Sequence, residues 1–268
     1  MRTVVHVSDL HFGRTRPELL APLLNSIEAA APDLVAVSGD LTQRARAGQF
    51  AAAGRFLAAL PKPVLVVPGN HDVPLDAVWT RLFRPWRRYR RRIEQELEPC
   101  FRDDEIVVAG INTVTPFAWQ RGWITRRAAA RACAAFAGAG RRTRIVVTHH
   151  PFVHAPDQAH KALMRGSARS LRALAECGAD IFLSGHLHSW RADLHRPLVS
   201  DLGPVLLIQA GTGLSTRLRG ESNDYNVLRI EPGAVTIRRF AADEAASGFR
   251  CIAEKRFVRE ERGWRAWP

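Results

Sequence analysis

The chain of 268 residues lacks several features that would place it in a specialised class of protein. Its four cysteines lie far apart and form no C-x-x-C pair, which argues against a zinc knuckle or a disulfide-rich secreted scaffold. We therefore expect reduced cysteines that mainly serve packing. No apolar run approaches the roughly 20 residues needed to cross a bilayer. The N-terminus enters a strand-like segment at Thr3 and leaves no room for a signal peptide, so we expect a cytoplasmic location.

Acidic residues are few relative to basic ones, 26 against 39, which gives a formal net charge of +13. This balance favours anionic partners such as phosphate esters, nucleic acid or an acidic membrane surface. Nearly all of the basic residues are arginine, and alanine is also abundant, so GC-rich coding accounts for part of the excess. Because no nucleic-acid-binding module accompanies the charge, we expect no dedicated nucleic-acid partner.

Short β-branched runs alternate with stretches rich in alanine, arginine and leucine, which predicts an α/β fold. The expected strands are 4–7, 34–38, 64–67, 106–111, 145–148 and 181–184, and the expected helices are 17–30, 47–59, 79–97, 125–137 and 167–177. From residue 205 the pattern changes to consecutive strands at 205–209, 225–230 and 235–240, which predicts a second sheet. We expect a single domain over 1–258, built as a four-layer α/β/β/α sandwich of two mixed sheets flanked by helices. Residues 259–268 would be a C-terminal extension, either docked or frayed.

Acidic, amide and histidine side chains directly follow five of the expected strands. They form the segments Asp9-Leu10-His11, Gly39-Asp40, Gly69-Asn70-His71-Asp72, His149-His150 and Gly185-His186-Leu187-His188. One such segment alone is more often a turn or a helix cap than a ligand set. Loops at the carboxyl ends of strands border the usual ligand crevice of an α/β sheet, so five of them together predict a metal site.

In this order the five segments resemble the signature of the calcineurin-like metallophosphoesterase superfamily, D-x-H, G-D, G-N-H-D/E, H-x or H-H, and G-H-x-H. The resemblance runs from Asp9 to His188, about two-thirds of the chain. Within the superfamily, the segments 39–42, 68–72 and 148–151 are similar to the bacterial class III cyclic-nucleotide phosphodiesterases. A second proline often follows the last of these segments, whereas this chain has Phe152, which could reshape the edge of the pocket.

The resemblance implies two metal ions. One would be held by Asp9, His11, Asp40 and His188, and the other by Asp40, Asn70, His149 and His186, with Asp40 bridging. Carboxylate, amide and imidazole ligands without thiolate suit two divalent ions of manganese, iron or zinc, a mixed pair included. Such a pair would generate a bridging hydroxide that attacks the phosphorus atom. His150 would orient a neighbouring ligand or tune the site.

The catalytic candidates are Asn70, His71 and Asp72. His71 is not a ligand in the family scheme and could protonate the leaving alkoxide, while Asp72 could fix the tautomer of His71 or simply cap a turn. We predict hydrolysis of a small phosphodiester, and the resemblance favours a 3′,5′-cyclic nucleotide. The alternatives are a lipid-linked or nucleic-acid phosphate as substrate, or a scaffold without turnover, although every expected site position is occupied. A homodimer is possible.

Two further segments carry charge or glycine near the expected site. The stretch from Arg81 to Arg92, with aromatic residues interleaved from Trp79 onward, is either a surface helix whose aromatic side chains pack inward or a lid for an anionic substrate. Residues 211–213 and 217–226 follow a strand, and they either contact phosphate or form a long turn.

Overall fold

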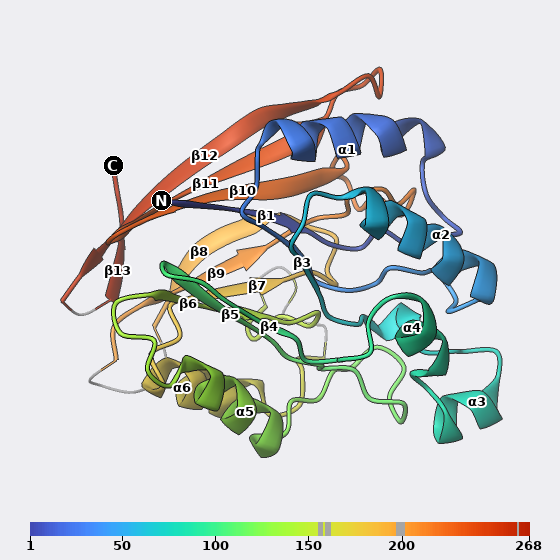
Figure 1. Cartoon of the computed structure of the whole chain (residues 1–268), viewed down its shortest axis with the longest axis horizontal. Coiled ribbons are helices and arrows are strands. Elements are labelled where there is room, and N and C mark those ends of the chain that lie inside the picture. The colour runs from blue at the N-terminus through green and yellow to red at the C-terminus, as the bar shows by residue number, and fades with distance from the viewer. Residues whose placement is uncertain (155–157, 159–161, 197–201, 262) are drawn as a thin grey trace.

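Two β-sheets lie face to face with helices on their outer faces (Figure 1). The computed structural model describes residues 1–154, 158, 162–196, 202–261 and 263–268. One sheet has seven strands in the order β13-β12-β11-β10-β1-β2-β3, and the other has six in the order β4-β5-β6-β7-β9-β8. Both contain parallel and antiparallel pairs, which confirms the predicted four-layer sandwich of mixed sheets.

The elements have the following bounds. The seven-stranded sheet contains β1 (Arg2–Val7), β2 (Leu34–Val37), β3 (Val64–Val66), β10 (Asp224–Glu231), β11 (Ala234–Ala242), β12 (Phe249–Glu260) and β13 (Gly263–Ala266). The six-stranded sheet contains β4 (Cys100–Arg102), β5 (Ile106–Gly110), β6 (Thr143–Val147), β7 (Ile181–Ser184), β8 (Arg191–His195) and β9 (Val205–Gln209). The helices are α1 (Leu20–Ala29), α2 (Ala47–Ala59), α3 (Val78–Phe83), α4 (Arg87–Arg92), α5 (Arg126–Phe136) and α6 (Ser167–Glu176), with short 3-10 turns η1 (Pro17–Leu19) and η2 (Asn70–Asp72).

Three apolar layers hold the sandwich together. Successive strand residues point to opposite faces, so Val4 of β1 packs between the sheets while Val5 packs beneath α1 and α2. In the other sheet Val108 packs between the sheets, and Val107 packs against α5 and α6. Strands buried on both faces need apolar residues at every position, which explains the continuous β-branched runs in the sequence.

The strands after residue 205 do not form a sheet of their own, contrary to expectation. β9 pairs with β7 in the six-stranded sheet, whereas β10 crosses to the other sheet and pairs with β1. The tail placed outside the domain contributes the end of β12 and all of β13. Its Trp264 is buried in the layer between the sheets.

The single helix expected over 79–97 was a wrong prediction. The structure has the short helices α3 and α4 there, separated at Pro85. Proline has no N–H to continue the helical hydrogen bonds, and it disfavours the helical conformation of the residue before it. We had considered that the aromatic side chains of this segment pack inward. This is so for Tyr89 of α4, which is buried, whereas Trp79 and Phe83 of α3 face outward.

Two of the four cysteines also differ from expectation. Cys133 of α5 and Cys177, which follows α6, form a disulfide between two helices on the same face of the six-stranded sheet. Cys100 and Cys251 are free, but they are exposed and so serve no packing role. Among the described residues, no helix is long and apolar enough to span a membrane. The cytoplasmic location stays a prediction.

Candidate metal centre

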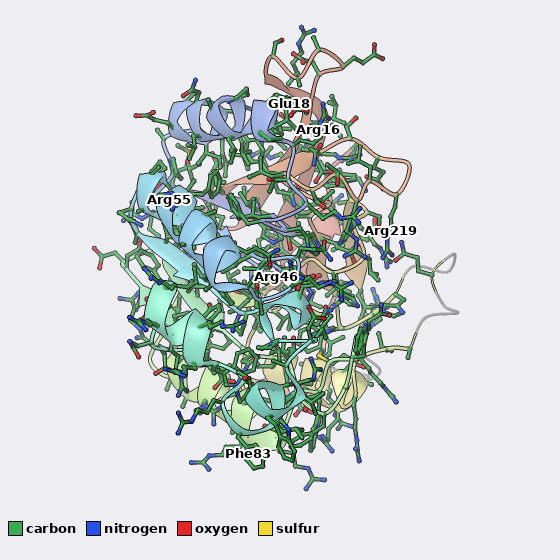
Figure 2. The ribbon with its side chains drawn as sticks, turned by 90° about the vertical axis from the view of Figure 1, so that its right-hand side faces the viewer. Arg16, Glu18, Arg46, Arg55, Phe83 and Arg219 are labelled. Carbon is green, nitrogen blue, oxygen red and sulfur yellow. A yellow bond between two sulfur atoms is a disulfide. The ribbon has the colours of Figure 1, made fainter. Side chains whose placement is uncertain are left out.

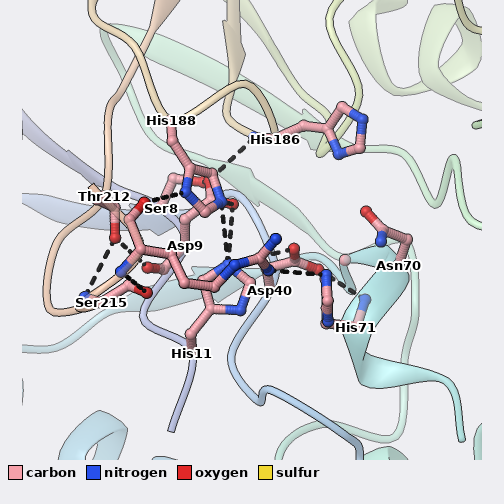
Figure 3. A network of polar contacts seen from close by, with 12 residues as sticks. Ser8, Asp9, His11, Asp40, Asn70, His71, His186, His188, Thr212 and Ser215 are labelled. Atoms are coloured by element: carbon pink, nitrogen blue, oxygen red, sulfur yellow. Dashed lines mark hydrogen bonds and ion pairs between the residues drawn. The ribbon is translucent and has the colours of Figure 1, made fainter. Parts of the chain in front are cut away.

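All seven predicted ligand residues meet at one edge of the sandwich, where the carboxyl ends of strands from both sheets converge. Figure 3 labels six of them, all but His149. The loops after β1, β2 and β3 bring three of the five segments, and the loops after β6 and β7 bring the other two. The seven residues are Asp9, His11, Asp40, Asn70, His149, His186 and His188. Only His186 is more than marginally exposed, and the other six are buried.

The backbone of this edge is unusual for residues other than glycine. Asp9, His11, Asp40, His186 and His188 have φ values of 52°, 49°, 52°, 73° and 56°. This left-handed conformation costs roughly 1–2 kcal/mol per residue, so the surrounding structure must hold it. Part of that support is a close approach of two loops, because a Cβ atom on Gly69 would lie 2.0 Å from the Asp40 backbone nitrogen. Only glycine fits at position 69.

The first cluster places hydrogen-bond acceptors against one another. His188 donates its Nδ1 proton to the carbonyl oxygen of Arg217 at 2.8 Å, so its Nε2 carries a lone pair when the ring is neutral. That Nε2 lies 3.1 Å from Asp9 Oδ1 and 3.1 Å from His11 Nε2. Asp9 Oδ1 is buried and has no hydrogen-bond donor in the described chain. A cation among these atoms would remove the conflict.

The second cluster repeats this pattern. His149 donates from Nδ1 to the carbonyl oxygen of Ser38 at 2.8 Å, which leaves the Nε2 lone pair 3.0 Å from Asn70 Oδ1. The same Nε2 lies 3.2 Å from His186 Nδ1 and 3.4 Å from Asp40 Oδ1. The other oxygen of Asp40, Oδ2, faces the first cluster, 3.6 Å from His11 Nε2. Asp40 therefore stands between the two clusters.

The electrostatics favour ionised carboxylates, and they favour neutral rings for His11 and His186. Burial lowers the pKa of His11, and burial together with His150 and His149 lowers the pKa of His186 well below its ordinary value. Burial opposes ionisation of Asp9, but His188 and His11 hold the pKa of its carboxyl well below the usual range. These are the protonation states that a divalent cation requires of its ligands. His188 differs, because the Asp9 carboxylate raises its pKa against the effect of burial, so a cation bound there would displace the His188 proton.

His150 has both ring nitrogens engaged by the protein. Nδ1 accepts from the Thr113 hydroxyl at 2.8 Å, and Nε2 donates to the carbonyl oxygen of Gln120 at 2.9 Å. Its ring lies beside that of His186, with centroids 4.6 Å apart. This ring contact would let His150 orient His186, and that role stays a prediction.

His71 and Asp72 differ in what they contact. His71 donates from Nδ1 to the carbonyl oxygen of Gln43 at 2.8 Å, and its Nε2 accepts from Arg217 Nη1 at 3.1 Å. The Asp72 carboxylate instead accepts from the backbone N–H groups of Gly69, Leu41 and Thr42 at 2.9 to 3.1 Å. Of the two roles considered for Asp72, these contacts match the cap of a turn and not a contact that fixes the tautomer of His71. Gln43 takes that position, while Asp72 ties the loops after β2 and β3 together.

Arg217 is a site residue that the sequence placed only within a longer segment. Its carbonyl oxygen fixes the His188 ring and its guanidinium reaches His71, so it connects the loop after β9 to both ends of the site. In the same loop, Thr212 donates its hydroxyl proton to the carbonyl oxygen of Asp9 at 2.7 Å. The available signal was the glycine-flanked turn after a predicted strand, which indicated position but not contacts.

Comparison with known proteins identifies similar sequences and folds. Glycerophosphodiester phosphodiesterase GpdQ of Enterobacter lignolyticus (strain SCF1) is 28% identical over 160 residues, 55% of this chain and 56% of that relative. The fold is similar to purple acid phosphatase PPD1 from yellow lupin (Lupinus luteus) seeds, with TM-score 0.66 and 13% identity over 97% of this chain and 54% of that chain. It is also similar to a dimetal phosphatase from Danio rerio, with TM-score 0.63 and 11% identity over 94% and 98% of the two chains.

The chain thus spans only about half the length of GpdQ and of the lupin phosphatase. A family model described as calcineurin-like phosphoesterase matches residues 2–190, a span that includes all five segments of the site. This match covers more than half of the sequence, and the chain belongs to the calcineurin-like phosphoesterase family.

Proposed function

We propose that the chain is a phosphoester hydrolase with a centre for two divalent metal ions, and that it cleaves a small phosphodiester. The observation that carries this proposal is the pair of buried clusters beside Asp40, in which His188 Nε2 faces Asp9 Oδ1 and His149 Nε2 faces Asn70 Oδ1. Asp9, His11, Asp40 and His188 would hold one cation, and Asp40, Asn70, His149 and His186 the other. The oxygen and nitrogen donors suit manganese, iron or zinc, and we propose manganese or iron in at least one position.

Two such cations would lower the pKa of bound water and would draw charge from the phosphoryl oxygens. The residues of the chain have separate tasks. Gln43 fixes one proton of His71 on Nδ1, so Nε2 would have to take up a second proton from solvent before it passes that proton to the leaving oxygen. In the free protein that atom accepts from Arg217. A phosphoryl oxygen is a stronger acceptor than a neutral imidazole, so bound substrate would draw the guanidinium away and free Nε2.

The substrate we propose is a 3′,5′-cyclic nucleotide, on the similarity of segments 39–42, 68–72 and 148–151 to class III phosphodiesterases. A glycerophosphodiester is the second candidate, because the similar protein GpdQ is named for that activity. Both are small phosphodiesters with one negative charge at the reacting group. The scaffold alternative has no support from the site, where every expected ligand is present.

The test is hydrolysis of bis(p-nitrophenyl) phosphate by chelator-stripped protein, before and after manganese is added. We expect turnover that requires the metal and that falls about 100-fold in His71→Ala while the amount of bound metal stays the same. His195→Ala, which removes a histidine of β8 outside the site, is the matched control and should keep its turnover. Protein that takes up metal without turnover would contradict the phosphodiesterase assignment, and protein that takes up no metal would contradict the metal centre.

Comparison of kcat/KM for cyclic AMP, glycerophosphocholine and p-nitrophenyl phosphate then separates the substrate classes. The proposal expects the highest value for cyclic AMP. A higher value for glycerophosphocholine would select the second candidate, and a preference for the monoester would exclude both.

A further inference from the structure

Helix α3 buries its charged residue and exposes its apolar ones, the reverse of an ordinary surface helix. Its only charged residue, Arg81, is 9% exposed, whereas Trp79 and Phe83 are 76% and 72% exposed. Val78 and Leu82 are exposed as well. Trp79 and Phe83 stack on each other, with ring centroids 5.8 Å apart. A helix that faces water normally buries its apolar side chains and exposes its charges, so α3 is patterned for an apolar environment.

Arg81 joins this helix to a second exposed segment. Its Nε donates to the carbonyl oxygen of Pro116 at 2.6 Å and its Nη2 to that of Ala118 at 2.5 Å. Between and beside these carbonyls, Phe117 is 81% exposed and Trp119 is 59% exposed. We define the apolar face as these side chains together with those of α3: Val78, Trp79, Leu82, Phe83, Phe117 and Trp119. Single exposed apolar residues are ordinary, but a contiguous group marks an interaction surface.

Arginines border the apolar face. Six follow or precede Pro85, namely Arg84, Arg87, Arg88, Arg90, Arg91 and Arg92, and none forms an ion pair within the described part of the chain. Arg87, Arg88, Arg91 and Arg92, together with Ala47 and Thr80, line a hollow of about 270 Å³ between α2 and α4. Like charges at this density repel, so the cluster is complementary to an anionic partner.

The apolar face and the arginines around it together indicate what kind of partner binds there. Apolar and aromatic side chains bordered by unpaired arginines match the interface of an anionic lipid bilayer, where the apolar groups enter the acyl boundary and the guanidinium groups meet phosphate headgroups. Single-stranded nucleic acid would need separate aromatic platforms for its bases. In the apolar face Trp79 and Phe83 stack on each other and Val78 and Leu82 are aliphatic, which leaves only Phe117 and Trp119 as separate aromatic side chains.

The apolar face lies close to the metal-ligand loops, so docking through it would place those loops beside the partner. α3 and α4 lie at the same end of the molecule as the metal-ligand loops, and Phe83 lies at the periphery in Figure 2. Arg81 also donates to the carbonyl oxygen of Pro74, two residues after Asp72. The segment that carries Phe117 and Trp119 continues to Gln120, whose carbonyl oxygen holds His150. We propose that the apolar face and its arginines dock this protein on an anionic lipid surface, with the metal-ligand edge beside the membrane.

Cosedimentation with lipid vesicles tests the proposal independently of catalysis. We expect binding to phosphatidylcholine vesicles that contain about 30% phosphatidylglycerol, little binding to phosphatidylcholine alone, and release by salt. Trp79→Ala with Phe83→Ala should weaken binding at least about tenfold. Arg87→Gln with Arg91→Gln should weaken it roughly fivefold per arginine. Neither pair should change turnover of bis(p-nitrophenyl) phosphate, because none of these residues contacts the site.

The matched controls are exposed residues elsewhere. Trp267→Ala removes an exposed tryptophan. Arg141→Gln with Arg229→Gln removes two exposed arginines that form no ion pair with the described residues, and all these variants should bind vesicles as the parent does. Failure to bind anionic vesicles, or equal binding by the Trp79 and Phe83 variant, would overturn the proposal. A dimer that this variant abolishes would assign the face to a second copy of the chain. Tight binding of single-stranded DNA, lost in the arginine variant, would assign it to nucleic acid.

Discussion

The metal-ligand edge and the three apolar layers are both buried, but burial has opposite consequences in the two regions. In the layers, extended strands bury valine and isoleucine, which stabilises the fold by about 25 cal/mol per Å² of apolar surface. At the edge, Asp9, His11 and Asp40 are buried just as completely, yet they bring carboxylates and lone pairs together on a left-handed backbone. The comparison teaches that the sheets supply stability, whereas the loops at their ends use it to hold an unfavourable arrangement ready for cations.

The sharpest test of this contrast is Asp40→Asn, because Asp40 stands between the two clusters. Metal-dependent turnover should fall about 1,000-fold or more, since one bridging charge is lost. In the presence of a chelator the variant should unfold at a slightly lower temperature than the parent, because burial opposes ionisation of Asp40 but His149, His71 and His11 hold its pKa below the usual value and so stabilise its charge. Turnover and calorimetry measure the two effects. Asp104→Asn, at an exposed position, is the matched control, and strong destabilisation by Asp40→Asn alone would break the contrast.

Removal of the disulfide tests how much the helices outside the six-stranded sheet contribute to stability and to the site. Cys133 and Cys177 are 44 residues apart in sequence, and loss of a crosslink that closes such a loop costs about 4 kcal/mol of unfolding free energy through the unfolded state. Cys133→Ala with Cys177→Ala should show this loss in denaturant melts with turnover unchanged. The control, Cys100→Ala with Cys251→Ala, removes the two free cysteines and should leave stability nearly the same. A fall in turnover would mean that α5 and α6 also support the edge.

Ile237→Ala tests the layer between the sheets. Ile237 of β11 is fully buried there, so truncation should cost about 3 kcal/mol, and Ile237→Val about 1 kcal/mol. We expect kcat per folded molecule to stay within about twofold of the parent, because the substitution affects the layer and not the loops. Chemical denaturation and steady-state kinetics provide the two measurements. A large change in kcat would show that the layer and the edge are coupled.

The strands of the layers were predictable because burial on both faces demands continuous apolar runs. β12 has twelve residues that are mostly exposed, so it carries no such run and was missed. The assignment of β9 and β10 to different sheets was also missed, since it depends on where the chain crosses between layers. In the segment after Trp79, the regular spacing of arginines and aromatics suggested one helix, although Pro85 interrupts it.

The composition of the site could be predicted further than its geometry. Ligand residue types directly after strands, in a characteristic order, indicated which side chains would meet. Their tautomers could not be predicted, because the backbone carbonyls of Gln43 and Ser38 fix them, and those atoms leave no trace in the sequence pattern. The contacts of Arg217 were hidden for the same reason. They depend on how a loop after β9 crosses the site.

The left-handed backbone of Asp9, His11, Asp40, His186 and His188 has an evolutionary consequence. Glycine and asparagine adopt this conformation at less cost than most other residues. A lineage freed from selection for turnover could therefore gain folding stability by drifting toward those residues at these positions. This chain nevertheless has aspartate or histidine at all five positions, where their side chains reach the two clusters.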